Sequence, residues 1–181
     1  LRDGAGALLG YTVVRADQTR LSFDAQGRLT RWEDTNGVFQ SYTYGTAGVT
    51  QVTDDAGHVL SYAYSASGRL STVTDEIGTV LVRYTYASDR LASVTDRMGH
   101  VTRYFYFSDG YLQRIELPAA QTVGGVAQSF DTRSISFEYR TLTGAGVPPA
   151  GTRVLSRMVD AEGKATGFSY DFAVDAGGLR T

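Results

Sequence analysis

Two histidines are the side chains of this sequence best suited to acid–base catalysis or metal binding. His58 and His100 are the only histidines among the 181 residues, and each directly follows a glycine. A general base or a metal site needs other groups that converge on the imidazole, and neither histidine has a second one at helical spacing. Val38 and Thr79 occupy the same position of an internal repeat. We therefore interpret both histidines as exposed residues after a turn, and we expect no catalytic residue, no bound metal and no cofactor.

The acidic residues recur with a spacing that suits turns better than metal ions. Calcium requires six or more oxygen ligands that converge on one ion, whereas one acid per turn spreads the oxygens along the chain. Asp at the first position and Gly at the fourth fit a type I turn, in which the aspartate accepts hydrogen bonds from the backbone. The pattern predicts turns, with calcium binding as the weaker alternative. The predicted turn residues are Asp34 and Gly37, Asp54 and Gly57, Asp75 and Gly78, Asp96 and Gly99, and Asp160 and Gly163.

Pairs of aromatic residues at alternate positions are the third chemical candidate. Such a row can stack between neighbouring units or can form a surface that stacks on sugar rings. We favour structural stacking, because sugar-binding repeats of this period are rich in tryptophan and this chain has only Trp32. Trp32 occupies the repeat position of Val52 and Val73, which indicates a core residue. The aromatic residues are Tyr42, Tyr44, Tyr62, Tyr64, Tyr84, Tyr86, Tyr104, Tyr106, Phe137, Tyr139, Phe168 and Tyr170.

The elements that must position these residues are short strands within a repeat of about 21 residues. Large residues fall at every second position in 60–64 and 101–106, which is typical of strands, and no stretch keeps an amphipathic helical period. Each unit is thus predicted to be a two-stranded hairpin, and a lone hairpin is marginal in water. The sequence predicts an all-β fold, in which tandem hairpins pair into a long curved antiparallel sheet and support one another.

The spacing between Leu70 and Val73 leaves one local alternative open. Residues three apart lie on opposite faces of a regular strand. Either both faces of the sheet are partly covered, or a β-bulge intervenes.

We expect one domain over 1–181, with breaks where the repeat fails. An initial hairpin is expected over 1–18, regular repeats over 19–117, and a last repeat over 154–175. Proline-containing or glycine-containing stretches at 118–131 and 141–153 are expected to be insertions in long loops, which carry site-specific function more often than a scaffold does. The first residue is Leu1, without a signal segment, and we expect the sequence to be a piece of a longer protein.

Composition excludes several classes of protein. The formal net charge is −2, with 17 basic and 19 acidic residues, so no basic stripe is available for a nucleic-acid backbone. No cysteine is present, which excludes a disulfide scaffold or a thiolate metal site. No run of residues is apolar enough to span a membrane as a helix.

The combination of motifs resembles the YD repeats of Rhs proteins. It is clearest in Y-A-Y at 62–64, G-R-L at 68–70 and V-T-D at 73–75, and in F-S-Y-D at 168–171. The Asp of the namesake dipeptide is kept only at Asp24, after Phe23, and at Asp171. The resemblance implies a segment of a hollow β shell, as in Rhs proteins, insecticidal toxin subunits and teneurins.

The resemblance also implies partners and a location. The partners would be adjacent repeats of the same longer chain and an enclosed toxin domain. The protein would be bacterial and secreted or exposed at the cell surface, and it would act as a wall and not as an enzyme. The alternative is an adhesion module that binds a glycan or a cell-surface receptor through its aromatic residues or its insertions.

Overall fold

The computed structural model describes residues 1–118, 133–142 and 152–170, and the backbone of the short strands within 119–132 and 171–181. Most of both predicted insertions, and Asp171, lie outside the described residues. All regular secondary structure within the described part is β, which confirms the predicted fold class. The strands are β1 (Gly10–Val14), β2 (Arg20–Asp24), β3 (Leu29–Glu33), β4 (Phe39–Tyr44), β5 (Val49–Asp54), β6 (Val59–Tyr64), β7 (Leu70–Thr74), β8 (Val80–Ala87), β9 (Arg90–Asp96), β10 (Val101–Tyr106), β11 (Leu112–Glu116), β12 (Thr122–Val123), β13 (Val126–Ala127), β14 (Ser134–Thr141), β15 (Arg153–Val159), β16 (Ala165–Gly167), β17 (Ala173–Asp175) and β18 (Gly178–Arg180).

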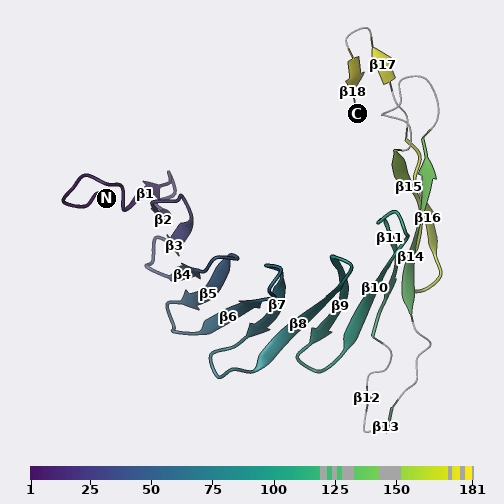
Figure 1. Cartoon of the computed structure of the whole chain (residues 1–181), viewed down its shortest axis with the longest axis horizontal. Helices are drawn as coiled ribbons and strands as arrows, with labels where there is room; N and C mark the ends of the chain where they lie inside the picture. The colour runs from purple at the N-terminus through teal and green to yellow at the C-terminus, as the bar shows by residue number, and fades with distance from the viewer. Residues whose placement is uncertain are drawn as a thin grey trace. The chain divides into compact units, whose positions relative to one another are not determined.

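The chain divides into two compact units. The first comprises Leu1–Thr85 with Asp96–Met98, and the second comprises Tyr86–Thr95 with Gly99–Thr181. In the first unit each strand from β1 to β8 pairs antiparallel with the next (Figure 1). In the second unit the order is β9-β10-β11-β14-β15-β16, again antiparallel. The predicted succession of antiparallel hairpins is therefore confirmed within each unit.

One turn geometry joins most of these strands. At Asp54 the backbone N–H donates to the carbonyl of His58 at 3.1 Å, and the N–H of Gly57 donates to the carbonyl of Asp54 at 3.1 Å. Gly57 adopts a φ of +88°, a region that costs side-chain-bearing residues energy. The Asp-x-x-Gly spacing produces this turn because Gly57 adopts the left-handed φ that closes it, while the Asp54 side chain accepts a hydrogen bond from the His58 N–H.

A β-bulge in the β6–β7 hairpin decides the question left open at Leu70 and Val73. Tyr62 faces Val73 and Tyr64 faces Leu70, so Ser71 is the extra residue without a partner. Because Tyr62 and Tyr64 share a face of their strand, Leu70 and Val73 also lie on that face. The Ser71 hydroxyl donates to the carbonyl of Ala63 at 3.0 Å, which satisfies an acceptor that the bulge removes from the ladder.

The same device recurs along both units. The register shifts in the same way in the hairpins β2–β3, β4–β5, β10–β11 and β14–β15. A hydroxyl again donates to the facing carbonyl from Thr30, Thr50 and Ser156, at 3.1, 3.3 and 3.0 Å. A Ser or Thr after the leucine or valine of the repeat is therefore a functional part of the bulge.

The bulge gathers large apolar side chains on one face, which we call the tyrosine face. In the first unit a row runs from Tyr62 to Val73 and Val82, each opposite the next. Among the described residues no apolar side chain is fully buried. The aromatic residues are half-buried and not in a closed core, because the described strands of each unit form a single layer.

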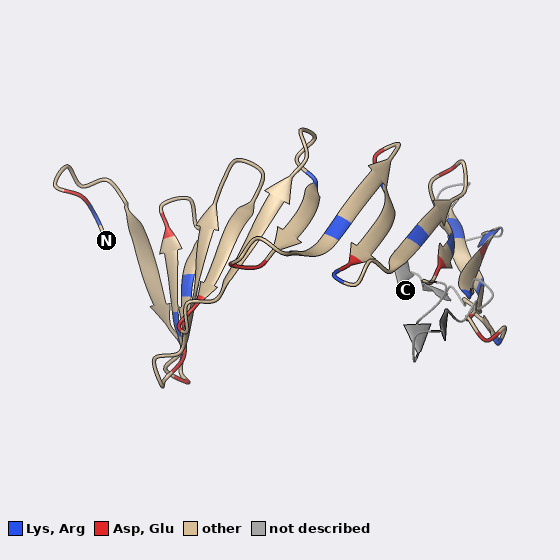
Figure 2. Cartoon of the chain, turned by 90° about the horizontal axis from the view of Figure 1, so that it is seen from below, with Lys and Arg blue, Asp and Glu red and all other residues tan. Residues whose placement is uncertain are grey.

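The opposite face carries charged pairs together with apolar side chains such as Phe39. Arg31 bonds Glu33 at 2.8 Å and lies over the ring of Phe39, with its guanidinium carbon 3.6 Å from the ring centroid. In the second unit Arg114 and Glu116 make the same pair at 2.9 Å. Figure 2 shows basic residues on strands and many of the acidic residues at the turns. The two faces therefore differ in character along the strands.

Two turns of the repeat type were not predicted. Asp3 and Gly6 close a hairpin within the first nine residues, with the Gly6 N–H bonded to the Asp3 carbonyl at 3.0 Å. Asp24 and Gly27 form the same turn between β2 and β3, at 3.1 Å. Both have the aspartate and glycine at the expected spacing, so the signal was present in the sequence.

Replacing Gln18 by glycine should stabilise the first unit. Gln18 takes the place of the turn glycine after β1 and has a φ of +68°. A side chain in this left-handed region costs on the order of 1 kcal/mol. We expect Gln18→Gly to raise the free energy of unfolding by about 0.5–1 kcal/mol, measured by urea denaturation.

The matched control is Gly57→Ala. The position of a new Cβ at Gly57 meets no atom within 4 Å, so any loss of stability comes from the backbone alone. It should lower the free energy of unfolding. A lower stability for Gln18→Gly, or an unchanged stability for Gly57→Ala, would contradict the assignment of strain to these turns.

Candidate functional site: the contacts between hairpins

The second tyrosine of a pair joins its hairpin to the preceding one. The Tyr44 hydroxyl donates to the carbonyl of Leu29 at 2.7 Å, and the Tyr64 hydroxyl donates to the carbonyl of Val49 at 2.7 Å. Donor and acceptor are 15 residues apart in both cases, so the bond repeats with the hairpins. We call this contact the tyrosine clasp. It satisfies a backbone carbonyl and a phenol at once.

An arginine of the preceding turn covers the same ring. Arg28 lies over Tyr44 with its guanidinium carbon 4.7 Å from the ring centroid, and its Nε bonds Asp24 at 2.7 Å. In the second unit Arg90 lies over Tyr106 at 5.7 Å. Arg28 thus pairs with the aspartate of its own turn and contacts the next hairpin through the ring of Tyr44.

Glycine makes room for the clasp. A Cβ at Gly48 would lie 2.9 Å from the Tyr64 hydroxyl oxygen, which is closer than real Cβ contacts allow. Gly48 also has a φ of +147°. The backbone of one hairpin can therefore approach the tyrosine of the next only where a side chain is absent.

The structure places the predicted aromatic residues in two sets. The first members of the pairs face a residue of the next strand: Tyr42 faces Val52, Tyr62 faces Val73, Tyr104 faces Ile115 and Phe137 faces Met158. The second members face the residue before the bulge: Tyr44 faces Val49, Tyr64 faces Leu70, Tyr106 faces Leu112 and Tyr139 faces Leu155. Tyr84 and Tyr86 are half-buried on β8, and Phe168 and Tyr170 are exposed.

Trp32 takes the slot that the sequence assigned to it. It faces Leu21, as Val52 faces Tyr42 and Val73 faces Tyr62. The indole is half-buried. It belongs to the tyrosine face and not to a closed core.

The predicted turn residues lie at the ends of strands, where each aspartate caps a backbone. Oδ1 of Asp34 accepts bonds from the N–H groups of Asn36 and Val38, at 2.8 and 2.9 Å. The aspartates at positions 75 and 160 make the same two bonds within their turns, and Asp96 accepts one from Met98. In the part of the chain that the structure describes, no three acidic or histidine side chains gather in a group that could hold a metal.

His58 is coupled to its turn aspartate. Its Nδ1 lies 2.9 Å from Oδ2 of Asp54, and its backbone N–H donates to Oδ1 at 2.9 Å. The hydrogen bond and charge of Asp54 raise the pKa of His58, and the same hydrogen bond lowers the pKa of Asp54. The imidazole is largely exposed. The pair stabilises a turn.

A cluster in the second unit was not predicted from the sequence. The guanidinium carbon of Arg153 lies 5.2 to 5.5 Å from the ring centroids of Phe107, Tyr111 and Tyr139, and the group also bonds Asp109. Burial raises the pKa of Tyr139, and the charge of Arg153 opposes that rise. Tyr139 is the second aromatic of its pair, so Arg153 covers a ring as Arg28 covers Tyr44.

The sequence carries a signal for this cluster in the turn before β11. Phe107 stands where the turns at 24–28 and 65–69 have Asp or Ser, and Tyr111 stands where these two turns have Arg. The turn thus lacks its own cation. Arg153 supplies it from 44 residues beyond Asp109, at the start of β15.

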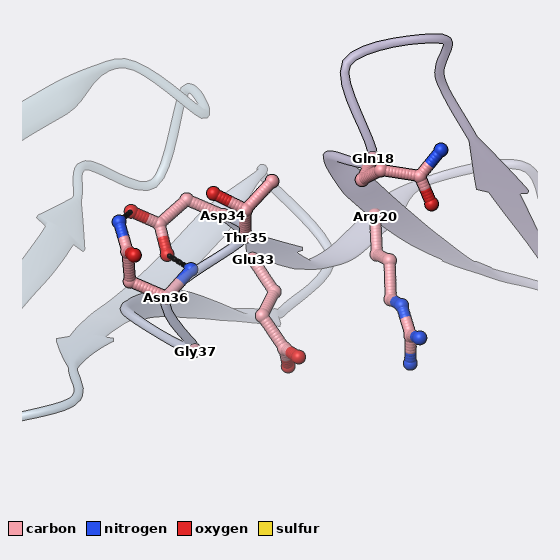
Figure 3. A pocket seen from close by; sticks show the side chains of 7 residues that line it. All are labelled: Gln18, Arg20, Glu33, Asp34, Thr35, Asn36 and Gly37. Atoms are coloured by element: carbon pink, nitrogen blue, oxygen red, sulfur yellow. Dashed lines mark hydrogen bonds between the residues drawn. The ribbon is translucent and has the colours of Figure 1, made fainter.

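A polar hollow of about 490 Å³ lies between the turns after β1 and β3 (Figure 3). Arg20 and Glu33 are opposite one another on β2 and β3. Glu33 is paired with Arg31, and Asp34 caps its turn, so both carboxylates are engaged. The hollow is lined by Gln18, Arg20, Glu33, Asp34, Thr35, Asn36 and Gly37.

The comparisons with known proteins agree with this geometry. A family model described as the RHS repeat matches residues 46–80 and 64–97. The two matches overlap and cover the β6–β7 hairpin with its bulge at Ser71 and the clasp between Tyr64 and Val49. Residues 46–97 of the chain are therefore RHS repeats.

Solved structures show the same fold as this Rhs-repeat chain. A crystal structure described as TcdB2-TccC3-TEV has 14% identity and a TM-score of 0.58, over 89% of this chain and 8% of that chain. A second, described as TcdB2-TccC3-Cdc42, has 16% identity and a TM-score of 0.50, over 96% of this chain and 10% of that chain. The Rhs-repeat chain thus spans a tenth or less of the length of these structures. No curated protein sequence matches it.

A third solved structure is described as the Photorhabdus luminescens Tc holotoxin pore with a TccC3-D651A mutation. It matches at 13% identity and a TM-score of 0.27, over 88% of this chain and 12% of that chain. Among the residues that the structure describes, no helix has the length and apolar character to cross a membrane.

Removing the clasp hydroxyl should weaken the first unit. We expect Tyr64→Phe to lower the free energy of unfolding by about 1 kcal/mol, because the Val49 carbonyl loses its donor while the ring stays in place. Tyr62→Phe is the control, since within the described residues no hydrogen bond is made by the Tyr62 hydroxyl. Urea midpoints that shift equally for both variants would contradict the clasp.

The His58 pair should make stability depend on pH. Because the pKa of His58 is raised in the folded chain, its protonation stabilises the fold fully at pH values below the unfolded pKa of about 6.5. This stabilisation is lost as the pH rises through the folded pKa. Because the pKa of Asp54 is lowered in the folded chain, its ionised carboxylate stabilises the fold at pH values above the unfolded pKa of about 3.9. This stabilisation is lost as the pH falls through the folded pKa. The pair is therefore strongest on the acidic side of neutral.

The measurement is the NMR titration of the His58 ring protons. The midpoint should lie higher in the parent chain than in Asp54→Asn. Equal midpoints would show that the contact does not persist in solution.

Proposed function

We propose that this chain is a wall segment of an Rhs-type shell within a larger bacterial toxin protein, secreted or exposed at the cell surface. Its role is structural and not catalytic. The tyrosine face would line the interior and would hold a toxin domain away from the producing cell. The observation that carries the proposal is the uncovered tyrosine face, with half-buried aromatic residues in both units.

A face of this kind needs a cover in the complete protein. Antiparallel sheets tolerate water on one face when that face is polar, and contiguous apolar patches on soluble proteins mark contact surfaces. The opposite face, with charged pairs such as Arg31 and Glu33 beside Phe39, suits solvent better than the tyrosine face. The apolar face is the one that gains from contact with an unfolded or partly folded polypeptide.

The TcdB2-TccC3 descriptions of the two similar structures support the proposal. The adhesion alternative needs aromatic rings that a sugar can reach. The clasp hydroxyls of Tyr44 and Tyr64 already donate to backbone carbonyls, and this engagement favours a wall over a sugar-binding surface.

Site-specific photo-cross-linking in the full-length protein tests the proposal. The photoreactive residue p-benzoylphenylalanine would replace Tyr62 on the tyrosine face and, as the matched control, Thr72 on the opposite face. These positions belong to neighbouring strands, since Tyr62 faces Val73 and Ala63 faces Thr72. Enclosure predicts cross-links from position 62, but not from position 72, to a segment of the same protein outside the repeats.

Two results would contradict enclosure. Position 62 could fail to cross-link to any other segment of the chain. Alternatively, a glycan array could give binding that is lost in Tyr62→Ala with unchanged stability, which would favour the adhesion module.

A further inference from the structure

The turn between β3 and β4 carries a chemically reactive pair. Asn36 is the only asparagine of the chain, and Gly37 follows it directly. The glycine has no side chain to shield its nitrogen, and a Cβ there would meet nothing within 4 Å. We propose that Asn36 is a site of spontaneous deamidation, and that the modification loosens this turn.

The Gly37 N–H is held less tightly than its counterparts. It donates to the Asp34 carbonyl at 3.3 Å, compared with 3.1 Å at Gly57 and 3.0 Å at Gly163. Ring closure requires the Gly37 nitrogen to leave this bond and turn toward the Asn36 side chain. Turn tips with exposed backbone bonds open more readily than the strands they join.

The Asn36 side chain is also accessible. The residue is exposed, and its Nδ2 reaches Oδ2 of Asp34 only at 3.5 Å, the outer limit of a hydrogen bond. Asn36 and Gly37 line the polar hollow of about 490 Å³ (Figure 3), so solvent water reaches both.

The reaction balances with water alone. The Gly37 nitrogen loses its proton to solvent and attacks Cγ of Asn36, which forms a five-membered succinimide and expels the side-chain nitrogen as ammonia. Water then adds to one of the two ring carbonyls, and the corresponding C–N bond breaks. One opening gives aspartate at position 36, and the other gives isoaspartate, in which the backbone runs through the side-chain methylene. No oxidant or reductant takes part.

The two products should differ in their effect on the turn. Glu162 occupies the corresponding position of the turn before β16, two residues after Asp160, and that turn keeps its bonds. A carboxylate at this position is therefore compatible with the geometry. Isoaspartate lengthens the backbone by one carbon between Asp34 and Val38, and this displaces the N–H groups that Asp34 holds.

The modification also changes the charge of the hollow. It adds one negative charge, from −2 to −3 for the chain, beside Glu33 and Asp34. Arg20 is the basic side chain that lines the same hollow. The new carboxylate would therefore stand beside the Asp34 carboxylate that the Asn36 side chain approaches in the parent turn.

Peptide mapping by mass spectrometry tests the proposal on the purified chain. The folded protein is incubated at mildly alkaline pH beside the same chain in urea, and the fraction modified at position 36 is followed over time. We expect conversion in the folded chain, faster at higher pH, with both aspartate and isoaspartate formed. Complete retention of the amide in the folded chain, while the unfolded chain converts, would overturn the proposal.

The effect on the turn is tested on the separated products. The isoaspartate fraction should show a lower urea midpoint than the parent chain. The aspartate fraction and the variant Asn36→Asp should keep the parent midpoint. An isoaspartate fraction with the parent midpoint would refute the loosening of the turn.

Discussion

The tyrosine clasp is the interaction on which the rest of the first unit depends. A single layer of strands has no interior, so each hairpin must find its stability in its neighbours. Ladder hydrogen bonds join strands, but they specify the register weakly by themselves, because a shifted ladder forms equivalent bonds. A phenol that reaches a carbonyl 15 residues earlier fixes one hairpin against the previous one. The ring that carries the hydroxyl also supplies apolar area on the same contact.

The bulge and the turn make the clasp possible. Without the extra residue at Ser71, Leu70 and Val73 would lie on opposite faces and the tyrosine face would lose half of its apolar row. Without a glycine at position 48, the Tyr64 hydroxyl would collide with a side chain. Small residues at fixed positions therefore do as much to define this repeat as the aromatic residues do. The Arg153 cluster shows that a ring can be covered by an arginine from another segment when the local one is missing.

The sequence predicted the features that depend on residues close together in the chain. Aspartate and glycine at fixed spacing specify a turn through bonds within five residues, so the turns could be foreseen, although those at Asp3 and Asp24 were overlooked. Alternation in residues 60–64 was enough to predict a strand. The acceptor of the Tyr64 hydroxyl and the origin of the cation over Tyr139 could not be foreseen. They depend on register and on chain segments 15 or more residues away, and a spacing rule does not carry that information.

Native-state hydrogen exchange in increasing urea tests most directly whether hairpins are held by their neighbours. The account predicts graded protection in the first unit, with β1 opening at the lowest free energy and the strands around β5 at the highest. It also predicts that loss of the Tyr44 hydroxyl lowers protection in β3 and β4 more than in β7. A single opening step with equal free energy from β1 to β7, unchanged by that loss, would contradict the central claim.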